Sequence, residues 1–116
     1  MKIGLVDDSV ILRSAIRNVL ESSGYEVVLE AGSSAELFEQ LNKNTPELIL
    51  LDVFFPTENG LDILARLRKQ FPKMKVLMVT GLKQETIAEE AKRLGADGIL
   101  YKPFDTDELL NTLKQV

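Results

Sequence analysis

The chain has 116 residues and a formal net charge of −4, with 45% hydrophobic and 28% charged residues, a composition typical of one soluble globular domain. The negative net charge argues against direct nucleic acid binding, and no apolar run is long enough for a transmembrane helix. The absence of cysteine and histidine excludes disulfides, thiolate metal sites, zinc bound through histidine and a histidine general base, and it favours hard cations bound through oxygen.

The first two predicted units each pair a short strand with a helix. Residues 2–6 (KIGLV) form an apolar strand, and apolar side chains recur at helical spacing over residues 10–20. Residues 26–31 (EVVLEA) place both glutamates on one face, which predicts a half-exposed edge strand. Residues 33–43 form the second helix, and its opening letters SSAE predict a capping box.

The next two units carry the most apolar strands. Residues 48–53 (LILLDV) are apolar on both faces up to Asp52, as expected of a central parallel strand. An amphipathic helix follows over residues 61–71, and residues 75–80 (KVLMVT) form another buried strand. The helix predicted over residues 84–95 has few apolar side chains to pack, so we expect it to be weakly anchored.

The fifth unit completes an α/β fold. Residues 98–102 (GILYK) form the last strand, and the helix over residues 105–116 begins with a capping box formed by Asp105 and Glu108. Five alternating units predict a (βα)5 domain over residues 1–116, a doubly wound parallel sheet with strand order 2-1-3-4-5.

Polar side chains follow the carboxyl ends of four strands: Asp7 and Asp8, then Asp52, Thr80 and Lys102. Doubly wound sheets bind ligands at this edge, and strands one and three are neighbours in the expected order, so the three acids should meet. Two adjacent carboxylates repel each other by up to roughly 4 kcal/mol at an effective dielectric of about 20, which indicates a cation between them. Mg²⁺ fits best, because it takes few carboxylates, keeps waters and accompanies phosphate.

Simpler interpretations exist for each residue alone. The two adjacent acids suit a capping turn before the first helix, with Ser9 as N-cap, and Asp52 suits a solvated strand end. Thr80 alone is more often a helix cap, and Lys102 alone is more often a surface lysine. The combination favours the cation site, because a cap needs no second acid and a buried run leads into Asp52.

Four motifs lie on the expected strands in order: VDDS on the first, LILLDVFFPTENG around the third, MVTG on the fourth and YKPF on the fifth. With them, the chain resembles a response-regulator receiver domain of two-component signal transduction over its whole length, as in chemotaxis regulators. Pro56 and Gly60 follow Asp52 at this family's spacing of +4 and +8. The resemblance implies a flavodoxin-like fold and a phospho-acceptor, Asp52, that takes a phosphoryl group from a phosphohistidine of a partner kinase.

The resemblance also implies a Mg²⁺ site. Asp8 binds the ion directly, Asp7 binds it directly or through water, and Asp52 and the carbonyl of Phe54 complete the protein ligands. Such a phosphoryl transfer depends mostly on positioning and charge neutralisation.

The remaining site residues implied by the resemblance act on the phosphoryl group. Lys102 neutralises its oxygens and Thr80 binds one of them, while the small Gly81 leaves the site open to the donor histidine. The Lys102–Pro103 peptide bond is expected to be cis, as in the family.

The function implied is that of a signalling domain, not an enzyme, although it assists its own phosphorylation and dephosphorylation. Its expected partners are a sensor histidine kinase or histidine phosphotransfer protein, and a downstream protein target or an output domain. No nucleic acid or membrane partner is expected, and the strand-like N-terminus suggests a cytoplasmic protein. The signal should appear on the surface of the fourth helix, fifth strand and fifth helix.

The usual aromatic switch position of the family, three residues before the lysine, holds Ile99 here, while the aromatic Tyr101 lies two residues further on. We therefore expect no large rotamer change at Ile99, because a β-branched side chain is stiff at χ1. The simplest interpretation of Tyr101 is that it packs against a flanking helix.

Three other functions use a related fold or related site residues. A flavodoxin-like electron carrier needs a phosphate loop rich in Ser, Thr and Gly after the first strand, where this chain has DDSV. A haloacid-dehalogenase-like phosphatase needs Asp-x-Asp, but Asp52 is followed by Val53 and Phe54. A degenerate receiver that binds partners without phosphorylation is disfavoured, because all the family's site residues are present.

Overall fold

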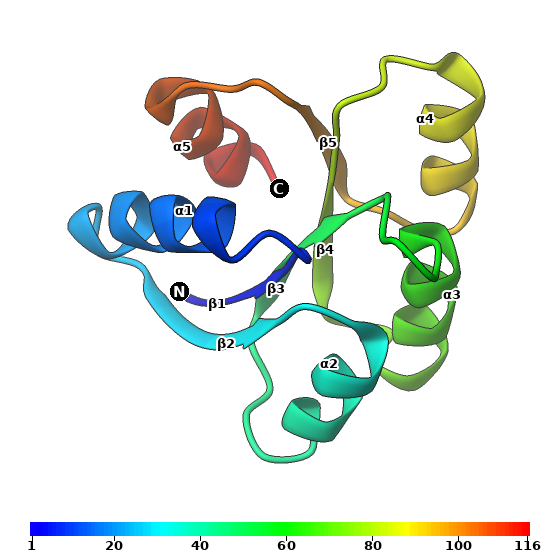
Figure 1. Cartoon of the computed structure of the whole chain (residues 1–116), viewed down its shortest axis with the longest axis horizontal. Helices are drawn as coiled ribbons and strands as arrows, with labels where there is room; N and C mark the ends of the chain where they lie inside the picture. Colours follow the sequence, from blue (N-terminus) through cyan, green and yellow to red (C-terminus); the bar gives the residue numbers. More distant parts are fainter.

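The computed structural model describes residues 1–116 as five strands alternating with five helices (Figure 1). The strands are β1 (Lys2–Val6), β2 (Glu26–Ala31), β3 (Leu48–Asp52), β4 (Lys75–Thr80) and β5 (Gly98–Tyr101). The helices are α1 (Val10–Ser22), α2 (Ser34–Leu41), α3 (Gly60–Gln70), α4 (Glu85–Arg93) and α5 (Thr106–Gln115).

All five strands are parallel, in the order β2-β1-β3-β4-β5, which confirms the predicted topology. Helices α1 and α5 cover one face of the sheet, and α2, α3 and α4 cover the other (Figure 1). The register pairs Val6 with Leu51 and Thr80 with Tyr101, so the carboxyl ends of these strands meet along one edge.

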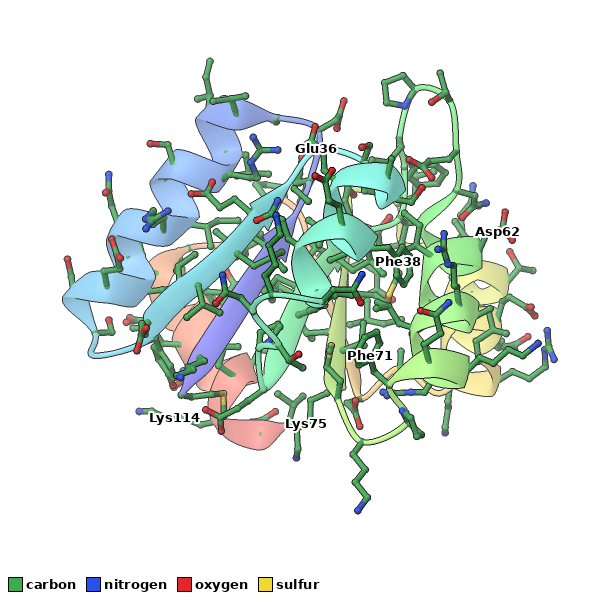
Figure 2. All side chains as sticks on the ribbon, turned by 90° about the horizontal axis from the view of Figure 1, so that it is seen from below. Glu36, Phe38, Asp62, Phe71, Lys75 and Lys114 are labelled. Atoms are coloured by element: carbon green, nitrogen blue, oxygen red, sulfur yellow. The ribbon has the colours of Figure 1, made fainter.

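Each face of the sheet has its own apolar core. Leu48 and Leu50 of β3 contribute to the core beneath α1 and α5, while Ile49 and Leu51 contribute to the core beneath α2, α3 and α4. All of β3 is buried, as predicted for a central strand, and each buried Leu or Ile contributes on the order of 1.5–3 kcal/mol. Figure 2 shows Phe38 of α2 turned toward α3, where the guanidinium of Arg66 lies 3.7 Å from its ring centroid.

The two flanking elements behave as their sequences predict. Along β2 buried side chains alternate with more exposed ones, as expected of an edge strand. Helix α4 has one buried residue, Ala91, and its Ile87 packs partly buried against the core, so few apolar side chains hold it, as its sequence predicts. None of the five helices has the length and hydropathy of a membrane-spanning segment.

Most differences from the predicted boundaries lie at helix ends. Ser33, Gln84 and Asp105 are N-caps and not helical residues, and α4 ends before Gly95, whose φ is 96°. The capping box at Asp105 is complete. The box predicted for α2 is only half formed, because the carboxylate of Glu36 accepts the N–H of Gly32.

Candidate functional site

The three predicted acids meet at the carboxyl edge of the sheet. Asp52 is the last residue of β3, and Asp7 and Asp8 follow β1, the strand paired with β3. One carboxylate oxygen from each lies within 4.8 Å of the others. Asp7 and Asp52 are buried, while Asp8 is exposed to solvent. Three oxygen ligands at this spacing, one of them open to solvent, suit a hard divalent cation.

Lys102, which follows β5, joins two of these acids. Its Nζ lies 3.1 Å from Oδ2 of Asp7 and 3.4 Å from Oδ2 of Asp52. A lysine ammonium is a single point charge, so it offsets only part of the charge of three carboxylates. The cluster therefore retains an attraction for a further cation.

In the turn between β1 and α1, the residue that caps the helix is not one of the two acids. Ser9 is the N-cap of α1, and its Oγ accepts the N–H of Leu12 at 3.1 Å. Oδ1 of Asp7 accepts the N–H of Ser9 at 2.9 Å. Capping thus accounts for Ser9, whereas the adjacent acids face the cluster shared with Asp52.

The electrostatics of Asp52 reflect its burial. Desolvation raises the pKa of this carboxyl above its ordinary value, and the negative charge of Asp7 raises it further. Lys102 and the backbone N–H of Phe54 act in the opposite direction but do not cancel the rise in pKa. A cation in the cluster would favour the ionised form, which is the nucleophilic one.

The chain beyond Asp52 is folded tightly against β3. The N–H of Gly60 donates to the carbonyl of Val53 at 2.6 Å, and a Cβ at Gly60 would lie 2.0 Å from the carbonyl oxygen of Asp52. Only glycine allows this approach, so the +8 spacing noted in the sequence has a steric cause. Asn59 caps α3 by accepting the N–H of Leu61 at 2.8 Å.

The same loop is also attached to α2. The carboxylate of Glu58 accepts the N–H of Ser34 at 2.9 Å, in the first turn of that helix. Hydrogen bonds from the side chain and backbone of Ser34 hold the pKa of Glu58 below its ordinary value. Sequence reasoning missed this contact, because nothing in the local pattern pairs residues 24 positions apart.

Thr80 is buried at the end of β4, but no hydrogen bond joins it to the three acids. Its Oγ1 instead accepts the N–H of Leu82 at 3.1 Å. Beside it, a Cβ at Gly81 would meet nothing within 4 Å, so this side of the site is open. The Lys102–Pro103 peptide bond is cis, as predicted.

The packing of Tyr101 against a flanking helix stays a prediction. Ile99 packs against the core beneath α2, α3 and α4, whereas Tyr101 packs against neither core. Tyr101 is the direct strand partner of Thr80, and Nζ of Lys83 lies 5.6 Å from its ring centroid. A side chain of the β4–α4 loop therefore covers the aromatic ring.

Most of the exposed large apolar side chains closely follow site residues in the sequence. Five large hydrophobic residues are exposed, and four of them follow site residues by two or three positions: Val10, Ile11, Phe54 and Leu82. A largely apolar groove of about 350 Å³ also lies between α1 and α5, with Lys102 and Pro103 in its wall. Exposed apolar surface of this kind is typical of protein-binding sites.

Comparison with known proteins gives a consistent result. The sequence profile of the response regulator receiver domain matches residues 3–114. The chemotaxis protein CheY of Listeria monocytogenes is 31% identical over 115 residues, which cover 99% of this chain and 97% of the relative. The positive transcription regulator BvgA of Bordetella pertussis is 30% identical, with 99% of this chain matching 55% of that protein.

Solved structures agree with these sequence relatives. The chemotaxis protein CheY4 of Vibrio cholerae superimposes with a TM-score of 0.93 at 32% identity, covering 99% of this chain and 97% of that chain. A CheY-like receiver domain protein of Methanospirillum hungatei gives a TM-score of 0.89 at 30% identity, covering 97% and 90%. Both similarities extend over nearly the whole chain.

Proposed function

The chain belongs to the family of response regulator receiver domains of two-component systems, and from this premise we propose that Asp52 accepts a phosphoryl group from the phosphohistidine of a partner protein. The observation that carries the proposal is the cluster of Asp7, Asp8 and Asp52 with Lys102 between two of them. The family consists of signalling domains and not of classical enzymes. The domain over residues 1–116 would therefore serve as a phosphoryl acceptor that assists its own phosphorylation and dephosphorylation.

We propose that Asp7, Asp8, Asp52 and the carbonyl of Phe54 hold Mg²⁺. The fit is supported by an all-oxygen donor set without histidine or cysteine, and by two buried carboxylates that share one lysine. When bound, the ion would neutralise charge on the phosphoryl oxygens.

In the transfer of the phosphoryl group to Asp52, the main contribution of the protein is to position the reacting groups. An ionised Asp52 oxygen forms a bond to phosphorus while the phosphorus–nitrogen bond of the donor breaks, and the electron pair returns to the imidazole ring. Lys102, whose Nζ is 3.4 Å from the Asp52 carboxylate, would remain beside the added oxygens. The opening at Gly81 would admit the donor side chain.

Thr80 connects this chemistry to a change of shape. Its hydroxyl accepts the N–H of Leu82, and donating to a phosphoryl oxygen would require Thr80 to turn toward Asp52. The β4–α4 loop would follow, together with α4, which packs against the core mainly through Ala91 and Ile87. We propose that the signal appears on the surface formed by α4, β5 and α5, without a large rotamer change at Ile99.

The partners proposed are a sensor histidine kinase or histidine phosphotransfer protein as donor, and a protein target or output domain as receiver. Apolar side chains such as Ile11 and Phe54 near the site support docking of a protein rather than a small phosphate donor alone. Longer relatives such as BvgA, of which this chain matches 55%, are compatible with an attached output domain.

The test is phosphate incorporation from acetyl phosphate, followed by mass spectrometry of the intact chain. Wild-type protein should gain one phosphoryl group only when Mg²⁺ is present, and Asp52→Asn should gain none. Asp62→Asn, at an exposed aspartate of α3, is the matched control and should behave as wild type. Incorporation into Asp52→Asn at the wild-type rate would refute the assignment.

A further inference from the structure

Arg13 of α1 is a largely buried cation beside the acidic cluster, and the chemistry proposed above does not use it. Its side chain is 14% exposed, its Nε lies 3.3 Å from Oε1 of Glu30, and its Nη1 donates to the backbone carbonyl of Asp7. Nε is the one buried side-chain nitrogen or oxygen of the chain without a hydrogen bond. Burial with an incomplete set of partners is unfavourable, so fold stability alone is a weak reason for this placement.

The surrounding chain leaves room for the guanidinium. A Cβ at Gly32 would lie 3.1 Å from Nη1 of Arg13, closer than ordinary van der Waals contact. Arg13 also lines a cavity of about 10 Å³ together with Asp7 and Asp52, roughly the space of one water molecule. Arg13, Asp7 and Asp52 are therefore the charged residues around one small, otherwise apolar cavity.

Asp7 is fixed at each of its polar groups. Its N–H donates to the carbonyl of Ala31 at 3.0 Å, and its carboxylate accepts from the N–H of Ser9 and from Lys102. The backbone carbonyl is held by Arg13. Arg13 thus supplies the side-chain contact that holds the peptide carrying this carboxylate, at the point where β1 has ended.

We propose that Arg13 is a positioning residue for the cation site: anchored by Glu30, it holds the backbone of Asp7 so that the Asp7 carboxylate is presented to the bound ion. This inference rests on the proposed function, because it takes the cluster to be a Mg²⁺ site. Residues that orient metal ligands typically change metal affinity by about 10–100-fold when they are replaced.

Replacing Arg13 would change the Mg²⁺ affinity in opposite directions, depending on whether Arg13 acts through its position or through its charge. A buried cation close to a Mg²⁺ site repels the ion, so removal of Arg13 would tighten binding if charge were its only influence. The nearby Glu30 offsets much of that charge. Loss of positioning predicts the opposite result, weaker binding.

The experiment measures the Kd of Mg²⁺ for the full chain by calorimetric titration, in wild type, Arg13→Gln and Arg13→Lys. Arg17→Gln is the matched control, because Arg17 lies one turn further along α1 and also pairs with Glu30 but has no contact with Asp7. Both Arg13 variants should bind Mg²⁺ about tenfold more weakly or worse, and Arg17→Gln should stay within about twofold of wild type. Arg13→Lys keeps the charge and so isolates the geometry.

Glu30→Gln is a second variant that leaves Arg13 in place and removes its anchor, and it should weaken binding less than Arg13→Gln does. Thermal unfolding without Mg²⁺ identifies any variant that has lost its fold. Wild-type or tighter Mg²⁺ binding by folded Arg13→Gln would overturn the inference. Absence of Mg²⁺ binding by wild type would instead overturn the proposed function, and this inference with it.

Discussion

Replacing Gly60 with alanine tests how closely α3 approaches the phospho-acceptor strand. At an ordinary helical position, Gly→Ala stabilises by about 0.5–1 kcal/mol. Here the new Cβ would lie 2.0 Å from the carbonyl oxygen of Asp52 and 2.8 Å from Cα of Val53, and both atoms belong to backbone. Neither can move without shifting the end of β3, and overpacking of this kind costs about 1–3 kcal/mol or more.

We therefore expect Gly60→Ala to lower the free energy of unfolding by about 1–3 kcal/mol, since the clash outweighs the helix preference. That loss corresponds to a fall in Tm of roughly 4–8 °C per kcal/mol for a domain near this size. Because the displaced backbone carries Asp52, Mg²⁺ should also bind more weakly. Circular dichroism melts and calorimetric titration measure the two effects.

Gly81→Ala is the matched control, because a Cβ there meets nothing within 4 Å. It should change the free energy of unfolding by no more than about 0.5 kcal/mol, as is usual for substitutions away from packed features, which corresponds to about 2–4 °C in Tm. If Gly60→Ala melted at the wild-type temperature and bound Mg²⁺ normally, the close approach of α3 to β3 would not hold in solution.

Three further predictions concern the charges of the site. Mg²⁺ at ten times its Kd should stabilise the fold by about 1.4 kcal/mol, and Asp8→Ala should raise the metal-free Tm while abolishing this gain; an unchanged wild-type melt together with a lower Tm in Asp8→Ala would contradict the cation site. Because the folded-state pKa of Asp52 is raised, its contribution to metal-free stability is complete below the ordinary carboxyl pKa and is lost as pH rises through the raised value. Chemical denaturation should therefore show Asp52→Asn gaining on wild type as pH rises above the ordinary carboxyl pKa, and a difference in stability that did not change with pH there would exclude the effect. Lys102→Ala should retain Mg²⁺ binding, but phosphorylation should no longer cause the full change of shape. NMR spectra with and without beryllofluoride, which mimics the phosphoryl group, should therefore differ less than in wild type. A spectral change as large as that of wild type would show that Lys102 does not couple phosphorylation to the change of shape.

The strands and their order could be predicted because their patterns are strong and local. The run Leu48–Asp52 is apolar on both faces, and only a central parallel strand buries both faces in a doubly wound sheet. Helix ends were less predictable, since a cap such as Ser33 resembles a helical residue until its hydrogen bonds are known.

The meeting of Asp7, Asp8, Asp52 and Lys102 could also be predicted, because carboxyl ends of neighbouring parallel strands share one edge. The hydrogen bonds that support the cluster could not be predicted. The hold of Arg13 on the Asp7 carbonyl depends on how α1 packs across the sheet, and residue spacing does not encode that contact. The hydroxyl of Thr80 likewise has a partner in its own loop, which a rule about strand ends does not foresee.

The division of the interior into two cores by the sheet has a consequence for how this sequence can diverge. A volume change beneath α1 and α5, for example at Leu109, is separated by the sheet from one beneath α2 and α3, for example at Leu64. Distant substitutions without shared neighbours act additively, so the helices of one layer can vary without matching changes in the other. All five strands place residues in both cores, so the sheet alone couples changes in one layer to changes in the other, and substitutions in the strands should be the slowest to accumulate.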